Sequence, residues 1–188
     1  MFYMDVNEKI KLKLLLKKDK DEFFKLINKN REHLREFMPR IEENKSVEDT
    51  EKVIQMFLQQ FQHDNGFRAG IIYDNLLIGI IGLKYIDWLN KKTEIMYWID
   101  KDYLGKGITT LCTNKVLQTA FEDYCLNKVI LKICSTNNAS IRIAEKCGFK
   151  LEATLREDEL LFSGFVDTNV YSILRSHYEE ALKGIMIP

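Results

Sequence analysis

The chain has 188 residues, of which 46% are hydrophobic and 30% are charged, and 28 lysines and arginines balance 28 aspartates and glutamates. This composition is typical of one globular domain over residues 1–188, without the basic excess of most nucleic-acid-binding proteins. No apolar run approaches the roughly 20 residues of a membrane-spanning helix, and the N-terminus lacks a signal-peptide core. We therefore expect a cytoplasmic protein that binds neither nucleic acid nor membrane.

The cysteines and histidines argue against a metal site. None of the four cysteines belongs to a C-x-x-C pair, and the three histidines are scattered along the chain. Zinc sites and disulfide frameworks usually space such residues regularly. We expect no metal and ordinary buried thiols at Cys112, Cys125, Cys134 and Cys147.

The first third of the chain predicts one strand and two helices. Residues 9–16 alternate and then become fully apolar, which indicates a strand. Residues 18–38 place apolar side chains near helical spacing, and Pro39 marks the end of that helix. Ser46 can cap a second helix, which we expect to stop at Gly66.

The remainder of the chain predicts strands and helices in alternation. Residues 67–87 favour two strands around a tight Asp74-Asn75 turn, and residues 91–100 favour a third. Further predicted elements are a helix from Gly107 to about Tyr124, a strand over 128–134, a helix over 137–149 closed by Gly148, and a hairpin over 154–174 that turns at Ser163-Gly164. The order predicts an α/β fold with a mixed sheet and helices packed against it.

The segment DYLGKGITT (residues 102–110) joins the strand predicted over residues 91–100 to the next helix. The first N–H groups of a helix lack internal partners, and glycines at 105 and 107 let the backbone approach an anion closely. Two common nucleotide motifs do not fit, because Ile108 replaces the lysine of a P-loop and Thr110 replaces the third glycine of the dinucleotide fingerprint. The segment alone predicts either a pyrophosphate site or a bare turn.

A second motif lies about 30 residues further on, where an Asn-x-x-Ser opening at Asn137 and a Lys-Cys-Gly-Phe close at Phe149 bound a helix. With YLGKGITT and the strand TEIMYWI, this order of motifs resembles the Gcn5-related N-acetyltransferase (GNAT) family. Within it, KYIDWLNKKTEIMYWI and EDELLFSGFVDTNVYSIL look like the RimJ/RimL branch of protein N-terminal acetyltransferases. The resemblance covers nearly the whole chain.

The resemblance implies a GNAT fold of about seven strands and about four helices, with a V-shaped splay between the fourth and fifth strands. It implies that acetyl-CoA binds there as cosubstrate, with its pantetheine arm along the fourth strand and its pyrophosphate on the glycine loop. The implied cofactor-binding residues are Tyr97, Trp98, Ile99, Leu104, Gly105, Lys106, Gly107, Ile108, Thr109, Asn137 and Ser140.

Two positions depart from the family pattern. Asp102 stands where the loop often begins with Gln or Arg, which matters little because backbone amides carry most of the phosphate binding. Ala144 stands where many relatives place a tyrosine as general acid. That role must be filled by another group or not at all.

Acetyl transfer requires a neutral amine, a polarised thioester carbonyl and a stabilised leaving thiolate. Glu159 is our first candidate base, because this branch carries an acid at the matching place, and Glu94 is the second. Either could instead be a solvated carboxylate at a strand edge, and Asp158 should face away from Glu159. Ser140 is the candidate proton donor to the thiolate, or a cap for the helix that follows it.

The acceptor follows from the resemblance and from amine chemistry. An α-amine, with an ordinary pKa of about 7.7–8.0, needs less help to become neutral than a lysine at about 10.4. A protein N-terminal amine of the ribosomal-protein-serine type, attacking the thioester directly, is the leading hypothesis. The alternatives are a small amine such as a polyamine or aminoglycoside, or a CoA-binding module without catalysis. A homodimer is a further expectation from the resemblance.

Overall fold

In the computed structural model, which describes residues 3–185, eight strands form one mixed sheet. The strands are β1 (Tyr3–Asp5), β2 (Ile10–Leu14), β3 (Phe67–Tyr73), β4 (Leu76–Asp87), β5 (Lys92–Ile99), β6 (Lys128–Cys134), β7 (Lys150–Leu161) and β8 (Gly164–Leu174). Their order across the sheet is β1-β2-β3-β4-β5-β6-β8-β7, so β8 lies between β6 and the edge strand β7.

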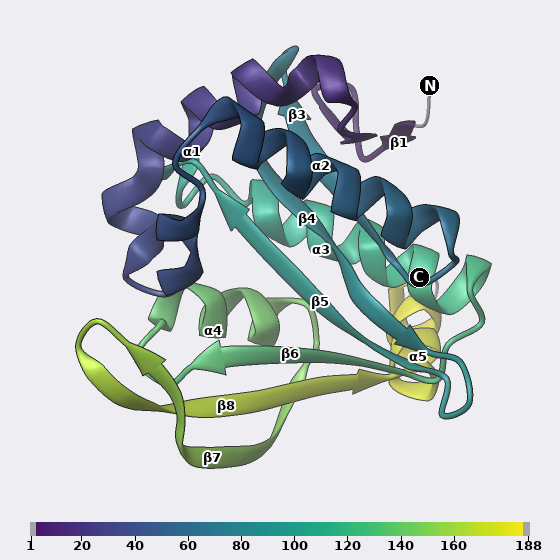
Figure 1. Ribbon diagram of the computed structural model, residues 1–188. Helices are drawn as coiled ribbons and strands as arrows, with labels where there is room; N and C mark the ends of the chain where they lie inside the picture. Colours follow the sequence, from purple (N-terminus) through teal and green to yellow (C-terminus); the bar gives the residue numbers. More distant parts are fainter. Residues whose placement is uncertain (1–2, 186–188) are drawn as a thin grey trace.

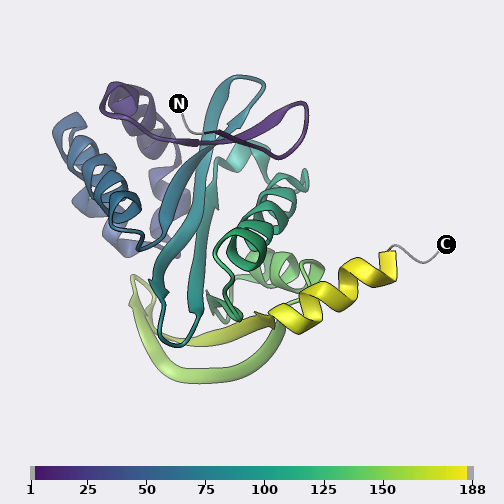
Figure 2. The same ribbon diagram turned by 90° about the vertical axis from the view of Figure 1, so that its right-hand side faces the viewer.

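Five α-helices accompany the sheet in the described part of the chain: α1 (Lys20–Arg35), α2 (Val47–Gln62), α3 (Ile108–Gln118), α4 (Asn138–Lys146) and α5 (Arg175–Ile185). The helices α1 and α2 cover one face, and α3 and α4 cover the other (Figures 1 and 2). Short 3-10 turns, η1 (Lys17–Asp19), η2 (Pro39–Glu43) and η3 (Lys101–Tyr103), and a π-helical turn, η4 (Thr119–Asp123), complete the connections.

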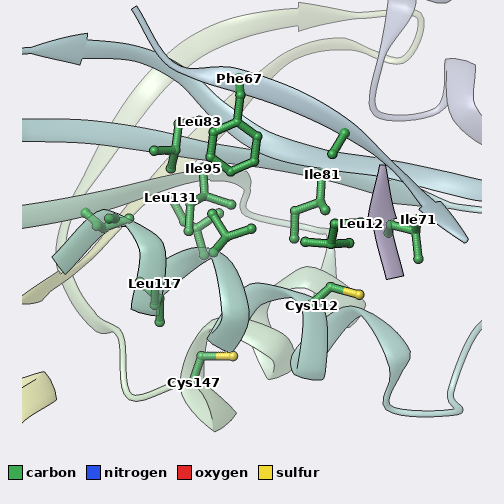
Figure 3. Packing of buried hydrophobic residues seen from close by; sticks show 14 of the residues in the cluster. Leu12, Phe67, Ile71, Ile81, Leu83, Ile95, Cys112, Leu117, Leu131 and Cys147 are labelled. Atoms are coloured by element: carbon green, nitrogen blue, oxygen red, sulfur yellow. The ribbon is translucent and has the colours of Figure 1, made fainter. Parts of the chain in front are cut away.

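Each face of the sheet buries its own apolar cluster. Behind the sheet, Cys112 of α3 and Cys147 at the end of α4 belong to one apolar cluster with sheet residues such as Leu12 and Ile81 (Figure 3). On the other face, α1 and α2 pack on the sheet. There Phe23 of α1 stacks on Trp98 of β5, with ring centroids 6.1 Å apart. β5 is therefore held from both sides, which fixes the strand that leads into the glycine loop.

Local signals in the sequence produce the expected element ends. The Ser46 hydroxyl accepts a hydrogen bond from the Asp49 N–H at 3.1 Å and so caps α2. Asp74 and Asn75 have φ values of 46° and 68°, the left-handed pair that a tight hairpin turn requires. The turn between β3 and β4 is thus confirmed at the predicted residues.

Three features of the fold differ from the sequence-based prediction. β1 is too short to give a pattern, and it forms because Met4 pairs antiparallel with Leu12 of β2. α5 follows β8 with no proline or glycine between them, and its Tyr178 packs on Phe121 with ring centroids 5.0 Å apart. β7 begins at Lys150, so the final hairpin is longer than predicted.

The strands β5 and β6 are hydrogen-bonded only at their beginnings. Their parallel ladder runs from the Lys92–Lys128 pair to the Glu94–Ile130 pair and then ends, although both strands continue. Figure 1 shows the two strands separating beyond this point. The V-shaped splay is confirmed between β5 and β6, which are the family's fourth and fifth strands once β1 is set aside. In the described part of the chain, residues 95–99 lack a strand partner on this side.

All four cysteines are free, and three of them are buried as expected. The expectation was wrong for Cys125, which is exposed because it lies in the turn before β6 with a φ of 51°. Within residues 3–185, no helix is both long and apolar enough to cross a membrane. In the same range, no three His, Cys, Asp or Glu residues are grouped so that they could hold a metal ion.

Candidate active site

The loop between β5 and α3 presents a row of backbone N–H groups. Gly105 and Gly107 have φ values of 73° and 75°, which residues other than glycine rarely adopt. The N–H groups of residues 105–110 find no acceptor within the described chain, and a Cβ added at either glycine would meet nothing within 4 Å. Because α3 also directs its positive dipole end here, the loop has the polarity and the open space of an anion site.

Contacts to α1 hold this loop in place. Asp100 is buried, and its carboxylate accepts hydrogen bonds from the Lys29 Nζ at 2.6 Å and from the Asp102 N–H at 3.2 Å. The Lys29 Nζ also lies 2.5 Å from the Asp102 carboxylate. The Asn30 side-chain oxygen accepts from the Lys101 N–H at 2.9 Å. Two adjacent residues of α1 therefore fix the turn that precedes the glycines.

Tyr97 of β5 lies against the start of α4, on the far side of the splay. Its hydroxyl donates to the Ser140 carbonyl oxygen at 3.5 Å. Burial raises the pKa of Tyr97 to about 12, although this hydrogen bond lowers it. The phenol therefore keeps its proton at neutral pH, close to the serine that we expected to protonate the thiolate.

The helix α4 is closed at both ends by the expected motif. The Asn137 side-chain oxygen accepts from the Ser140 N–H at 3.1 Å, so Asn137 is the cap and the capping role considered for Ser140 was wrong. Ser140 thus contributes its backbone N–H to the cap, and no hydrogen bond of its hydroxyl is found within residues 3–185. At the other end, Gly148 has a φ of 80° and the Phe149 N–H donates to the Ala144 oxygen at 3.0 Å.

Several of the predicted cofactor-binding residues can contribute only through their backbone. The side chains of Trp98 and Ile99 are core, on opposite faces of β5, and those of Ile108 and Thr109 are buried. Leu104, by contrast, is 44% exposed. The structure therefore supports a main-chain surface here rather than a set of recognising side chains.

Lys106 points along the loop to an aromatic ring. Its Nζ lies 4.7 Å from the centroid of the Tyr103 ring, a cation–π contact. It also borders a hollow of about 430 Å³ beside the loop, which is lined by Asn7, Glu8, Lys9, Ile10, Tyr73, Lys106, Ile108 and Leu111. The lysine is thus held at the rim of the loop.

The two candidate bases lie on the same face of the sheet. The pairing registers of β5, β6, β8 and β7 place Glu94 and Glu159 on the face that α1 and α2 cover. Glu94 is 5% exposed, and its carboxylate is bound by the Lys84 Nζ at 2.5 Å. Glu159 is partly exposed and has no ion-pair partner in the described chain. Of the two carboxylates, Glu159 is the one not already engaged.

A bulge in β7 precedes Glu159. Between Leu155 and Glu159, β7 has extra residues relative to β8. Glu157 has a φ of 49°, and its N–H donates to the Asp167 carboxylate at 2.9 Å. Such bulges redirect side chains and are common beside active sites. Because Asp158 lies within the bulge, the simple alternation from which we predicted its direction does not apply.

Comparison with known proteins agrees with this geometry. A family model described as "Acetyltransferase (GNAT) domain" matches residues 9–150. The "Putative ribosomal N-acetyltransferase YdaF" of Bacillus subtilis (strain 168) is 36% identical over 95% of this chain and 98% of its own. The "Ribosomal-protein-serine acetyltransferase" of Escherichia coli (strain K12) is 28% identical over 89% of this chain and 93% of its own.

Solved structures are similar over the same length. The microcin C7 self-immunity acetyltransferase MccE, in complex with acetyl-CoA and AMP, has a TM-score of 0.85 and 29% identity, covering 90% of this chain and 94% of its own. RimL, a ribosomal L7/L12 alpha-N-protein acetyltransferase in complex with coenzyme A, has a TM-score of 0.89, covering 92% and 98%. Its identity is 22%, so this likeness concerns the fold alone.

Substitution of Gly107 tests the anion site. Gly107→Val should weaken acetyl-CoA binding about tenfold or more, because the added side chain blocks the approach to the N–H groups. Gly164→Val is the matched control, since Gly164 also has a positive φ, of 110°, and open space around it, but lies in the β7–β8 turn. Calorimetric titration measures both variants. Equal affinity for Gly107→Val and Gly164→Val would contradict the phosphate role.

The pKa of Tyr97 predicts a loss of stability at alkaline pH. Because the folded-state pKa is raised from 10.0 to about 12, the stabilisation is complete below pH 10 and is lost as the pH rises to about 12. Urea unfolding across this window should give a shallower decline in the free energy of unfolding for Tyr97→Phe than for the unchanged protein. Identical slopes would show that the phenol is not buried as described.

Proposed function

The chain belongs to the GNAT family of acetyltransferases, and from this premise we propose that it acetylates a protein N-terminal α-amine with acetyl-CoA. The observation that carries the proposal is the position of the glycine loop at the end of β5, where β5 has already parted from β6. A splayed strand followed by free N–H groups suits an extended ligand that ends in a pyrophosphate.

The main chain would provide most of the cofactor site. The N–H groups of residues 105–110 would bind the pyrophosphate, and the unpaired side of residues 95–99 would bind the amides of the pantetheine arm. The Asn137 side-chain oxygen caps α4, while its nitrogen makes no hydrogen bond to the described residues and would reach the same arm. These contacts would direct the thioester toward the start of α4.

The side chains around this point supply the chemistry that the transfer needs. Glu159 would accept the proton of the incoming ammonium group, directly or through water, while Glu94 is the second candidate and must first release Lys84. A backbone N–H near Trp98 or Ile99 would polarise the thioester carbonyl. The Ser140 hydroxyl, beside the neutral phenol of Tyr97, would give its proton to the departing thiolate and take up in exchange the second proton that the attacking nitrogen loses as the amide forms. The amine attacks the thioester directly, so no acyl-cysteine is required.

Two lines of support favour an α-amine as the acceptor. An α-amine is partly neutral near pH 7, which matches a site whose free candidate base is a single carboxylate. The relative from E. coli that matches 89% of this chain is named a ribosomal-protein-serine acetyltransferase. A serine-initiated ribosomal protein is therefore the proposed acceptor class.

Release of thiol from acetyl-CoA tests the acceptor. Peptides that begin with free serine or alanine should be acetylated, while the same peptides with a blocked N-terminus and an internal lysine should not. Spermidine and an aminoglycoside complete the panel. Turnover with small amines alone would overturn the α-amine proposal, and CoA binding without turnover on any acceptor would indicate a binding module.

Substitution of the base gives a sharper test of the mechanism. Glu159→Gln should lower kcat by about 100-fold and leave the KM for acetyl-CoA nearly unchanged, because the carboxylate acts only in proton transfer. Asp158→Asn, the neighbour within the bulge, is the matched control and should retain activity. If Glu159→Gln keeps the original rate and pH profile, Glu159 is not the base.

We further propose that residues 1–188 act as one acetyltransferase domain in the cytoplasm and that this domain forms a homodimer. We also propose that it does not bind nucleic acid, since its 28 lysines and arginines are balanced by 28 aspartates and glutamates. Strands from both ends of the chain belong to one sheet, which supports a single domain.

The edge strand β7 is exposed along nearly its whole length and carries Leu151 and Leu160, while Phe162 and Phe165 beside it are 69% and 65% exposed. Unpaired edges with apolar side chains favour pairing with another chain. Analytical ultracentrifugation at micromolar concentration should show a dimer; a monomer would contradict this.

A further inference from the structure

Lys29 of α1 bridges two carboxylates that flank the turn before the glycine loop. Asp100 follows β5, Asp102 opens the loop, and the Lys29 Nζ lies 2.6 Å and 2.5 Å from their oxygens. We propose that Lys29 is a positioning residue for the CoA pyrophosphate, which fixes the loop and offsets part of the negative charge of Asp100 and Asp102 beside the phosphate site. The inference rests on the proposed use of acetyl-CoA.

The geometric part of this role depends on the buried carboxylate. Asp100 is 3% exposed, its N–H donates to the Ile78 oxygen of β4 at 2.7 Å, and its carboxylate accepts from the Asp102 N–H. A buried carboxylate is stable only when it is paired and hydrogen-bonded. Lys29 supplies that pairing from α1, so the direction in which the chain leaves β5 depends on a residue 71 positions earlier.

The electrostatic part concerns Asp102. Its side chain is 57% exposed and stands three residues before Gly105, at the entrance to the row of N–H groups. An uncompensated carboxylate there would repel a pyrophosphate. Hydrogen bonds to Asp100 and Asp102 raise the pKa of Lys29 well above its usual range, and the bond to Lys29 lowers the pKa of Asp102. Both groups therefore stay charged at neutral pH and compensate each other.

The role is distinct from that of an ordinary ion pair because it predicts an effect on one part of the ligand. Loss of Lys29 would disturb the phosphate end of acetyl-CoA and leave the pantetheine arm, which binds along β5, unaffected. Removing the Asp102 charge from the Lys29 variant would restore the electrostatic part of the affinity, although Asp100 would stay without its lysine. A lysine that only stabilised the fold would affect both ends of the ligand, and the loss of Asp102 would not compensate for it.

Calorimetric titration with CoA and with acetyl-pantetheine, which lacks the pyrophosphate, tests this inference. Lys29→Met should raise the Kd for CoA about fivefold at low salt, and less at high salt. The same substitution should leave the Kd for acetyl-pantetheine unchanged. Lys29→Met/Asp102→Asn should recover the part of the lost affinity that is due to the Asp102 charge, and Lys29→Arg should behave like the unchanged protein. Lys52→Met removes an exposed α2 lysine that pairs with Asp49 at 3.2 Å, and is the matched control.

The outcomes separate this inference from the proposed function. Binding of CoA by the unchanged protein with an unaltered Kd for Lys29→Met overturns the positioning role alone. The positioning role is also overturned if Lys29→Met loses the same factor of affinity for CoA and for acetyl-pantetheine. It is overturned as well if the double variant recovers none of the affinity for CoA. If Lys29→Met folds poorly, the single variant Asp102→Asn tests the charge argument instead. Asp102→Asn should bind CoA at least as tightly as the unchanged protein, and weaker binding would contradict the charge argument. Absence of any CoA binding by the unchanged protein overturns both proposals.

Discussion

Hydrogen bonding between β5 and β6 ends at the Glu94–Ile130 pair, and this interruption in the middle of the sheet governs the arrangement around it. Backbone N–H and C=O groups in a protein interior need partners. β5 obtains them from β4 on one side, as far as the Gly79–Ile99 pair, and beyond Glu94 no strand within residues 3–185 pairs with its other side. A ligand with amide groups of its own can fill this position, and the loop that follows offers N–H groups for its phosphates.

The proposed recognition surface is therefore mostly main chain, which fits the distribution of side chains around it. Trp98 and Ile99 stabilise β5 from opposite faces, so the strand keeps its position while its open edge stays free. The glycines at 105 and 107 keep the loop open. In the proposed mechanism, specific side chains are required where protons move, at Ser140 and Glu159, and where charge must be compensated, at Lys29.

Features that depend on local conformation could be predicted from the sequence. The glycine loop, the Asp74-Asn75 turn and the close of α4 at Gly148 all require left-handed backbone, which few residues adopt, and the residue types reveal them. The capping oxygen was harder to assign, because Asn137 and Ser140 are both good caps and only the geometry distinguishes them.

Features that depend on contacts distant in sequence could not be predicted. Lys29 is an unremarkable lysine on an amphipathic helix until Asp100 and Asp102 are brought to it. The bulge before Glu159 depends on the register of β7 against β8, which no local pattern encodes. The exposure of Cys125 and the formation of β1 likewise depend on how the chain is assembled.

The central claim is that this main-chain surface binds acetyl-CoA. Amide correlation spectra of the labelled protein during titration with CoA test it most directly, because every backbone N–H reports separately. The account predicts the largest shifts at residues 105–110, with further shifts at 95–99 and at the start of α4. Shifts confined to other elements, with the amides of residues 105–110 unchanged at saturation, would contradict it.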